Sequence, residues 1–146
     1  MRAKPPVLRV FEALVVLAAL ASLAIMVAWY EVLVTEAQRM GGSAYVPLLT
    51  IMFSMGYFLC FWFAVARRAS RVAYWIFFGL AFLGLVPHVA DWQAFTAEGA
   101  ERAYAFSTLA AQFVHVAAAC VMLVPEGQRW LSRRGTGEPD AADVFD

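Results

Sequence analysis

Four long apolar segments dominate the pattern of hydrophobic and polar positions along the chain. They cover about residues 10–30, 45–66, 72–92 and 104–124. Each is close to the roughly 20 residues that a helix needs to cross the bilayer core. Transmembrane strands fit poorly, because they alternate apolar and polar residues, whereas these segments are apolar throughout. The pattern predicts an all-α, polytopic membrane protein with four transmembrane helices in an antiparallel bundle.

The composition agrees with a protein that lies in a lipid bilayer. Of the 146 residues, 63% are hydrophobic and only 15% are charged. Soluble domains have about 45–50% apolar and about 25% charged residues, so this chain has too little charge to cover a soluble globule. The formal net charge is zero. A basic surface for nucleic acid is therefore not expected, and the bilayer is the expected partner.

The basic residues are distributed unevenly among the connections. Nine of the 11 precede the first segment, join the second to the third, or follow the fourth. The connections 31–44 and 93–103 hold only Arg39 and Arg102. Because basic residues are retained on the cytoplasmic side, we predict that both termini are cytoplasmic. The expected location is the bacterial inner (plasma) membrane.

The chain divides into a membrane domain and a short tail. Residues 1–134 form the predicted four-helix transmembrane domain, in which 125–134 is a short interfacial segment opened by Pro125. Residues 135–146 carry four acidic residues and no basic residue. This composition predicts an acidic, disordered cytoplasmic tail.

Polar residues inside the third and fourth segments are the candidate functional residues, because such groups are costly in lipid. In the third segment, His88 and Asp91 are three residues apart, beside Pro87, which is expected to kink the helix. We expect Asp91 to orient His88 near the outer mouth of the bundle.

In the fourth segment, Thr108, Gln112 and His115 share one helical face with alanines, while the other face is bulky and apolar. Such a helix turns its polar face toward the other helices.

Small and weakly polar residues in the remaining positions are candidates for helix packing, because they allow close approach or bond to a neighbouring helix. These candidates are Ala18, Ser22, Thr50, Ser54, Gly56 and Gly84.

One hypothesis for the two histidines is that His88 and His115 ligate haem b, since two neutral imidazoles can bind such an iron. Counted from the outer boundary, His88 lies about 6 Å deep and His115 about 16 Å deep. The two axial ligands of one haem iron must lie at the same depth, so haem binding would require a tilted helix or a re-entrant loop. No other metal or cofactor is expected, and no nucleophile or phosphate loop indicates an enzyme.

Two functions fit the sequence better. The first is a non-catalytic subunit or scaffold that packs with a membrane partner or with itself, as a homo-oligomer or in a larger complex. The alternative is a protomer of an oligomeric small-solute or proton transporter. His88, Asp91, Gln112 and His115 would then line its path. Carriers usually place a carboxylate near the midplane, and this chain has none, which favours the first function. A single bundle is also expected to have too little interior for an aqueous route.

Overall fold

The computed structural model describes residues 5–133, so the predicted acidic tail lies outside the described residues. The described part is helical, without strands. Its elements are, in chain order, α1 (Pro6–Ala28), α2 (Tyr30–Arg39), α3 (Val46–Trp62), the π-helix η1 (Phe63–Arg67), α4 (Arg71–Leu83), α5 (Val86–Ala90), the 3₁₀-helix η2 (Trp92–Phe95), α6 (Ala100–Val121) and α7 (Pro125–Arg133).

Four stretches of helix are long and apolar enough to cross a membrane. They are Pro6–Ala28, Val46–Arg67, Arg71–Ala90 and Ala100–Val121. They coincide with the four apolar segments of the sequence within a few residues. The prediction of an all-α protein is therefore confirmed, with four helices that are long and apolar enough to span a membrane, as in an integral membrane protein.

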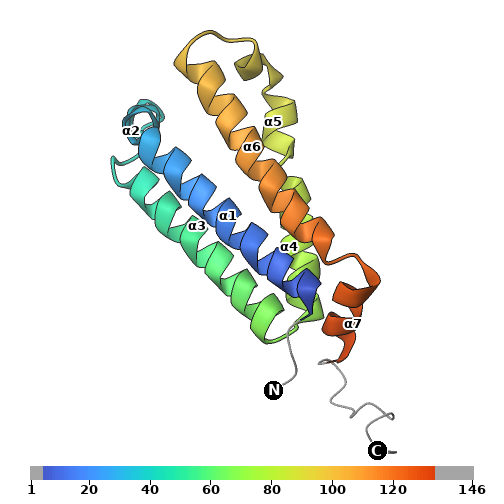
Figure 1. Cartoon of the computed structure of the whole chain (residues 1–146). Helices are drawn as coiled ribbons and strands as arrows, with labels where there is room; N and C mark the ends of the chain where they lie inside the picture. Colours follow the sequence, from blue (N-terminus) through green and yellow to red (C-terminus); the bar gives the residue numbers. More distant parts are fainter. Residues whose placement is uncertain (1–4, 134–146) are drawn as a thin grey trace, which may run out of the picture.

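The four helices run alternately in opposite directions (Figure 1). Helix α1 packs against α6 along much of its length and against α3 on another side, while α4 packs against α6. We call the end with the start of α1, the turn after η1 and helix α7 the terminal end. The opposite end, with α2 and η2, is the loop end.

The tightly packed core lies in the terminal half. The largest fully buried side chains are Leu8, Phe11, Val15, Val65, Tyr74, Phe77, Met122 and Leu131. Phe11 and Phe77 meet edge to face with ring centroids 5.8 Å apart, and the Tyr74 hydroxyl donates to the Ala119 carbonyl at 3.0 Å. These contacts tie α1, α4 and α6 together. In the loop half, by contrast, the buried apolar side chains are small, such as Ala37, Ala105 and Ala111.

The turn between α3 and α4 is formed by a π-helix, a residue with positive φ and a helix cap. The helix widens into η1, and Ala69 then adopts a positive φ of 48° while fully packed. Ser70 caps α4 by accepting a hydrogen bond from the Ala73 N–H at 3.2 Å.

The predicted interfacial segment forms α7, which folds back so that Leu131 is buried and Trp130 Nε1 donates to the Val65 carbonyl at 3.5 Å.

The third span is interrupted, as the proline in it predicts, but the interruption begins before the proline. Helix α4 ends at Leu83, and α5 starts at Val86 with Pro87 in its first turn, where no N–H is needed. The Leu85 N–H bonds to the Phe82 carbonyl at 3.0 Å. The Ala81 carbonyl thereby loses its usual partner four residues later.

Candidate functional site

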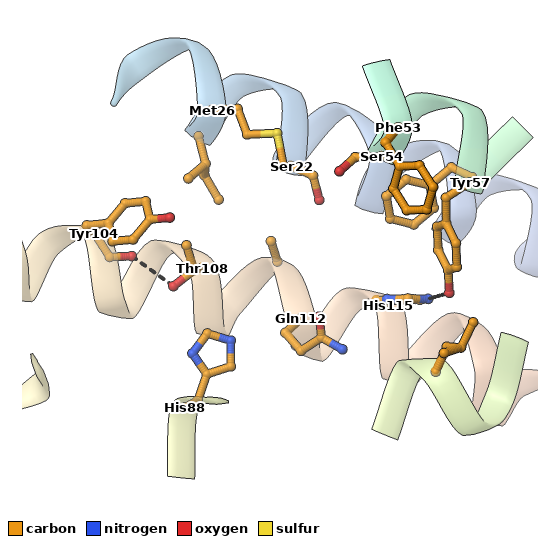
Figure 2. A pocket seen from close by; sticks show the side chains of 14 residues that line it. Ser22, Met26, Phe53, Ser54, Tyr57, His88, Tyr104, Thr108, Gln112 and His115 are labelled. Carbon is orange, nitrogen blue, oxygen red and sulfur yellow. Dashed lines mark hydrogen bonds between the residues drawn. The ribbon is translucent and has the colours of Figure 1, made fainter. Parts of the chain in front are cut away.

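A cavity of about 470 Å³ lies in the loop half, among helices from all four spans. We call it the chamber. Figure 2 shows its side chains converging from α1, α3, α5 and α6. Its hydrogen-bonding side chains are Ser22 (α1), Ser54 and Tyr57 (α3), His88 (α5), and Tyr104, Thr108, Gln112 and His115 (α6). The bundle therefore encloses a chamber in its loop half, whereas the expectation from the sequence concerned an aqueous route across it.

His115 closes the chamber toward the terminal end. Its side chain is buried, and its Nε2 lies 3.0 Å from the Tyr57 hydroxyl, with which it shares a hydrogen bond (Figure 2). The imidazole is surrounded by the rings of Tyr57, Phe58 and Phe77, at centroid distances of 5.6, 5.2 and 4.8 Å. Beyond them lies the aromatic core, so the chamber ends here.

Gln112 stabilises the interruption in the third span. Its Nε2 donates a hydrogen bond to the Ala81 carbonyl, which the break leaves without a helical partner. Gly84 makes this contact possible, because a Cβ at this position would lie 2.5–2.9 Å from three atoms of the Gln112 amide. Gly84 therefore contacts the neighbouring helix, and its partner is a side chain that packing patterns alone did not identify.

His88 and Asp91 do not form the expected pair. His88 points into the chamber toward α6 (Figure 2), and its ring lies 6.4 Å from that of Phe95. Within residues 5–133, no hydrogen bond or ion pair joins His88 to Asp91, which is exposed. The reason is that α5 ends at Ala90 and Asp91 leaves helical geometry (φ −108°, ψ 51°), so the three-residue spacing no longer aligns the two side chains. Both instead line a second cavity of about 280 Å³ next to the chamber.

Thr108 lines both cavities, but its hydroxyl donates to carbonyls of its own helix, Tyr104 and Ala105, each at 3.0 Å. The polar face of α6 thus divides by role. Gln112 and His115 bond to other helices, whereas Thr108 bonds back to α6.

The remaining packing candidates occupy different environments. Ala18 is fully buried in the core, while Ser22 and Ser54 line the chamber. Thr50 is exposed and donates to the Val46 carbonyl of its own helix at 3.0 Å. A Cβ at Gly56 would meet nothing within 4 Å, so Gly56 is not at a close helix crossing, contrary to expectation.

Two tyrosines belong to the site although the sequence did not mark them as candidates. Tyr57 partners His115, and Tyr104 borders the chamber and both smaller cavities, of about 280 and 200 Å³. The Tyr104 ring packs edge to face on Trp29 with centroids 5.8 Å apart. The available signal was a tyrosine inside an apolar span opposite a span that carries a histidine.

Four chamber side chains have hydrogen-bonding groups without a partner. In the part of the chain that the structure describes, no hydrogen bond involves the side chains of Ser22, Ser54, His88 and Tyr104. Serine in a membrane helix commonly bonds to the carbonyl four residues earlier, as Thr50 does here, so these free groups are a distinctive property of the chamber.

The two histidines are poorly placed for one haem iron. His88 lies beside Thr108 (Figure 2), whereas His115 is seven residues further along α6, about 10 Å at 1.5 Å per residue. His115 Nε2 is also engaged by Tyr57. Among the described residues, no group of three or more His, Cys, Asp or Glu side chains could hold a metal ion.

Comparison of the chain with protein-family models, with curated proteins and with solved structures gives no match. Its function is therefore inferred from the chamber itself.

The contact between Gly84 and Gln112 leads to the first prediction. Gly84→Ala should lower the stability by about 1–3 kcal/mol, because the new methyl group displaces the Gln112 amide from the Ala81 carbonyl. Thermal unfolding in detergent measures this. Gly79→Ala on the same helix is the matched control, since its Cβ would meet nothing within 4 Å. The effect of Gly84→Ala should largely vanish in a Gln112→Ala background; an equal loss in both backgrounds would contradict the contact.

The second prediction concerns the bond between Tyr57 and His115. A double-mutant cycle with Tyr57→Phe and His115→Leu should give a coupling energy of about 0.6–2 kcal/mol, the range for hydrogen bonds between membrane helices. His115→Gln should retain most of the stability, since an amide can accept or donate the same bond. Tyr104→Phe is the control, because its hydroxyl has no partner within the described residues. A coupling of zero would show that the bond does not stabilise the fold.

Proposed function

We propose that this protein is a non-catalytic integral membrane protein that binds a small molecule in the chamber. The observation that carries the proposal is the set of four unpartnered hydrogen-bonding side chains, Ser22, Ser54, His88 and Tyr104, inside a membrane-spanning fold. These polar atoms are accessible from the chamber, and at membrane depth a polar group without water or a partner costs roughly 2–7 kcal/mol. A bound molecule with hydrogen-bonding groups removes that cost. The volume of about 470 Å³ falls in the roughly 300–1,000 Å³ range of small-molecule sites.

The chemistry of the lining supports an uncharged ligand. No Lys, Arg, Asp or Glu is among the residues that line the chamber. An ionic ligand would be buried there without a counter-charge, which is strongly unfavourable. The serine hydroxyls of the lining have no hydrogen bond to a base, and the described residues hold no group of three or more metal ligands, which supports binding without catalysis.

The closed end of the chamber favours binding over transport. His115 and its surrounding rings separate the chamber from the terminal end. A transport path would require this aromatic group to open. Packing of the protein with a membrane partner or with a second copy of itself stays a prediction from the sequence.

We further propose that the terminal end faces the cytoplasm, in a bacterial inner membrane. The uneven distribution of basic residues supports this orientation. At the terminal end, Arg67 lies over the Trp62 ring at 5.3 Å and Arg68 over the Phe63 ring at 5.4 Å, a combination of basic and aromatic groups that suits a lipid headgroup region. The chamber would then lie in the outer half of the membrane.

Single cysteines test this orientation. The native Cys60 and Cys120 are first replaced by alanine, and cysteine is introduced at the exposed positions Ser43, Glu98 and Ser132. In intact cells, an impermeant thiol reagent should label positions 43 and 98, whereas position 132 should react only after permeabilisation. Labelling of position 132 in intact cells would contradict the orientation.

A chamber-filling variant tests binding. Ala111 lines the chamber and is buried. Ala111→Leu should therefore lower the occupancy of any molecule that co-purifies with the protein in lipid nanodiscs. A loss of about 1.4 kcal/mol of binding free energy corresponds to about a tenfold weaker affinity. Native mass spectrometry measures the occupancy. Ala110→Leu is the matched control, because the neighbouring Ala110 is exposed and outside the chamber. Equal occupancy in both variants would overturn the proposal.

A further inference from the structure

We infer that the ligand of the chamber is a membrane-dissolved amphiphile with an uncharged ring, of the isoprenoid quinone class, and that it enters sideways from the bilayer between α3 and α4–α5. This inference rests on the proposed function, to which it adds the ligand class and the route.

The route follows from which lining residues are exposed. Phe53 on α3 is 78% exposed and Leu80 on α4 is 39% exposed, yet both line the chamber. Both lie well inside stretches long and apolar enough to cross a membrane, Val46–Arg67 and Arg71–Ala90. At that depth the surroundings are hydrocarbon, so the wall that these two residues form opens toward lipid.

The packing of the helices explains why the opening lies there. Helix α3 is held mainly by α1, and its ring contacts with α4, from Tyr57 and Phe61 to Phe77, lie toward the short turn that joins them. Toward the loop end the two diverge, so that α5 lies well away from α3 (Figure 1). Contacts between α3 and α5 are correspondingly sparse. By contrast, α1 packs closely against α6, and residues of both helices line the chamber.

The ligand class follows from the shape and chemistry of the lining. Six flat rings contribute to it, from Phe53, Tyr57, Phe58, His88, Tyr104 and His115. A planar guest can pack against such rings with offset or edge contacts. The chamber also disfavours ionic headgroups, because no Asp, Glu, Lys or Arg side chain lines it. A planar, uncharged head therefore fits better than a phospholipid headgroup or a fatty acid.

The free hydrogen-bonding groups lie on opposite sides of the space. The Ser22 and Ser54 side chains are on the α1 and α3 side, and His88 approaches from the other (Figure 2). A quinone ring has two carbonyl oxygens on opposite edges, which can accept hydrogen bonds from hydroxyl groups and from a ring N–H at the same time. The apolar chain would leave between Phe53 and Leu80 into the lipid, where its burial costs nothing.

Photoaffinity labelling of the full chain tests this inference. The probe is an azido-benzoquinone with an isoprenoid chain, incorporated into phosphatidylcholine nanodiscs. We expect light-dependent labelling of peptides that contain chamber residues, competed by the unlabelled quinone. Leu80→Trp, which narrows the opening, should reduce labelling by about tenfold. Leu83→Trp is the matched control, because Leu83 is also exposed on α4 but does not line the chamber.

A second pair guards against a folding defect in Leu80→Trp. Phe53→Trp on α3 should also reduce labelling, whereas Leu49→Trp, one turn earlier and outside the chamber, should not. Thermal unfolding checks that all four variants are folded.

The contrary outcomes separate the inference from the proposed function. Labelling that both narrowing variants leave unchanged would overturn the sideways route. Equal competition by a fatty alcohol of the same chain length would overturn the recognition of a ring. No chamber labelling in the wild type, while Ala111→Leu still loses a co-purifying molecule, would overturn the quinone class and keep the chamber as a binding site. No effect of Ala111→Leu on any molecule would overturn the proposed function itself.

Discussion

The structure depends on one constraint, that polar groups at membrane depth must find partners inside the protein. The clearest case is the interruption of the third span at Gly84 and Leu85, which releases the Ala81 carbonyl. Gln112 of α6 donates to that carbonyl, and the missing side chain of Gly84 gives the amide its space. A break that would be unfavourable in isolation thereby becomes an anchor between two helices. Beyond the break, His88 of α5 lines the chamber.

The distribution of side-chain volume divides the fold into a packed half and an open half. In the terminal half, Phe11, Tyr74 and Phe77 fill the space between α1, α4 and α6. In the loop half the buried apolar positions on α6 are alanines, Ala105 and Ala111, which fill little volume. The chamber lies where these small side chains leave space among α1, α3, α5 and α6. The packed half therefore stabilises the fold while the open half keeps a cavity.

The sequence predicted the number and type of elements well, and the site less well. Helix number follows from the length of the apolar segments, which bilayer thickness sets, and the interruption of the third span follows from the chemistry of Pro87. The pairing of His88 with Asp91 was expected from helical spacing, which assumes an intact helix; the chain leaves helical geometry at Asp91. The bonds from Gln112 to Ala81 and from Tyr57 to His115 join different spans, and spacing within one helix carries no information on such contacts.

Differences among the polar residues of the chamber indicate which of them serve the fold. Gln112, Tyr57 and His115 form bonds between helices, so their polarity is explained by packing alone. Ser22, Ser54 and His88 have no such explanation within the described residues, and alanine or leucine at these positions would satisfy the fold more simply. Polar side chains at membrane depth are unfavourable unless something offsets their desolvation. Because these three line a cavity whose wall also includes the exposed Phe53 and Leu80, a bound molecule explains both their chemistry and their position.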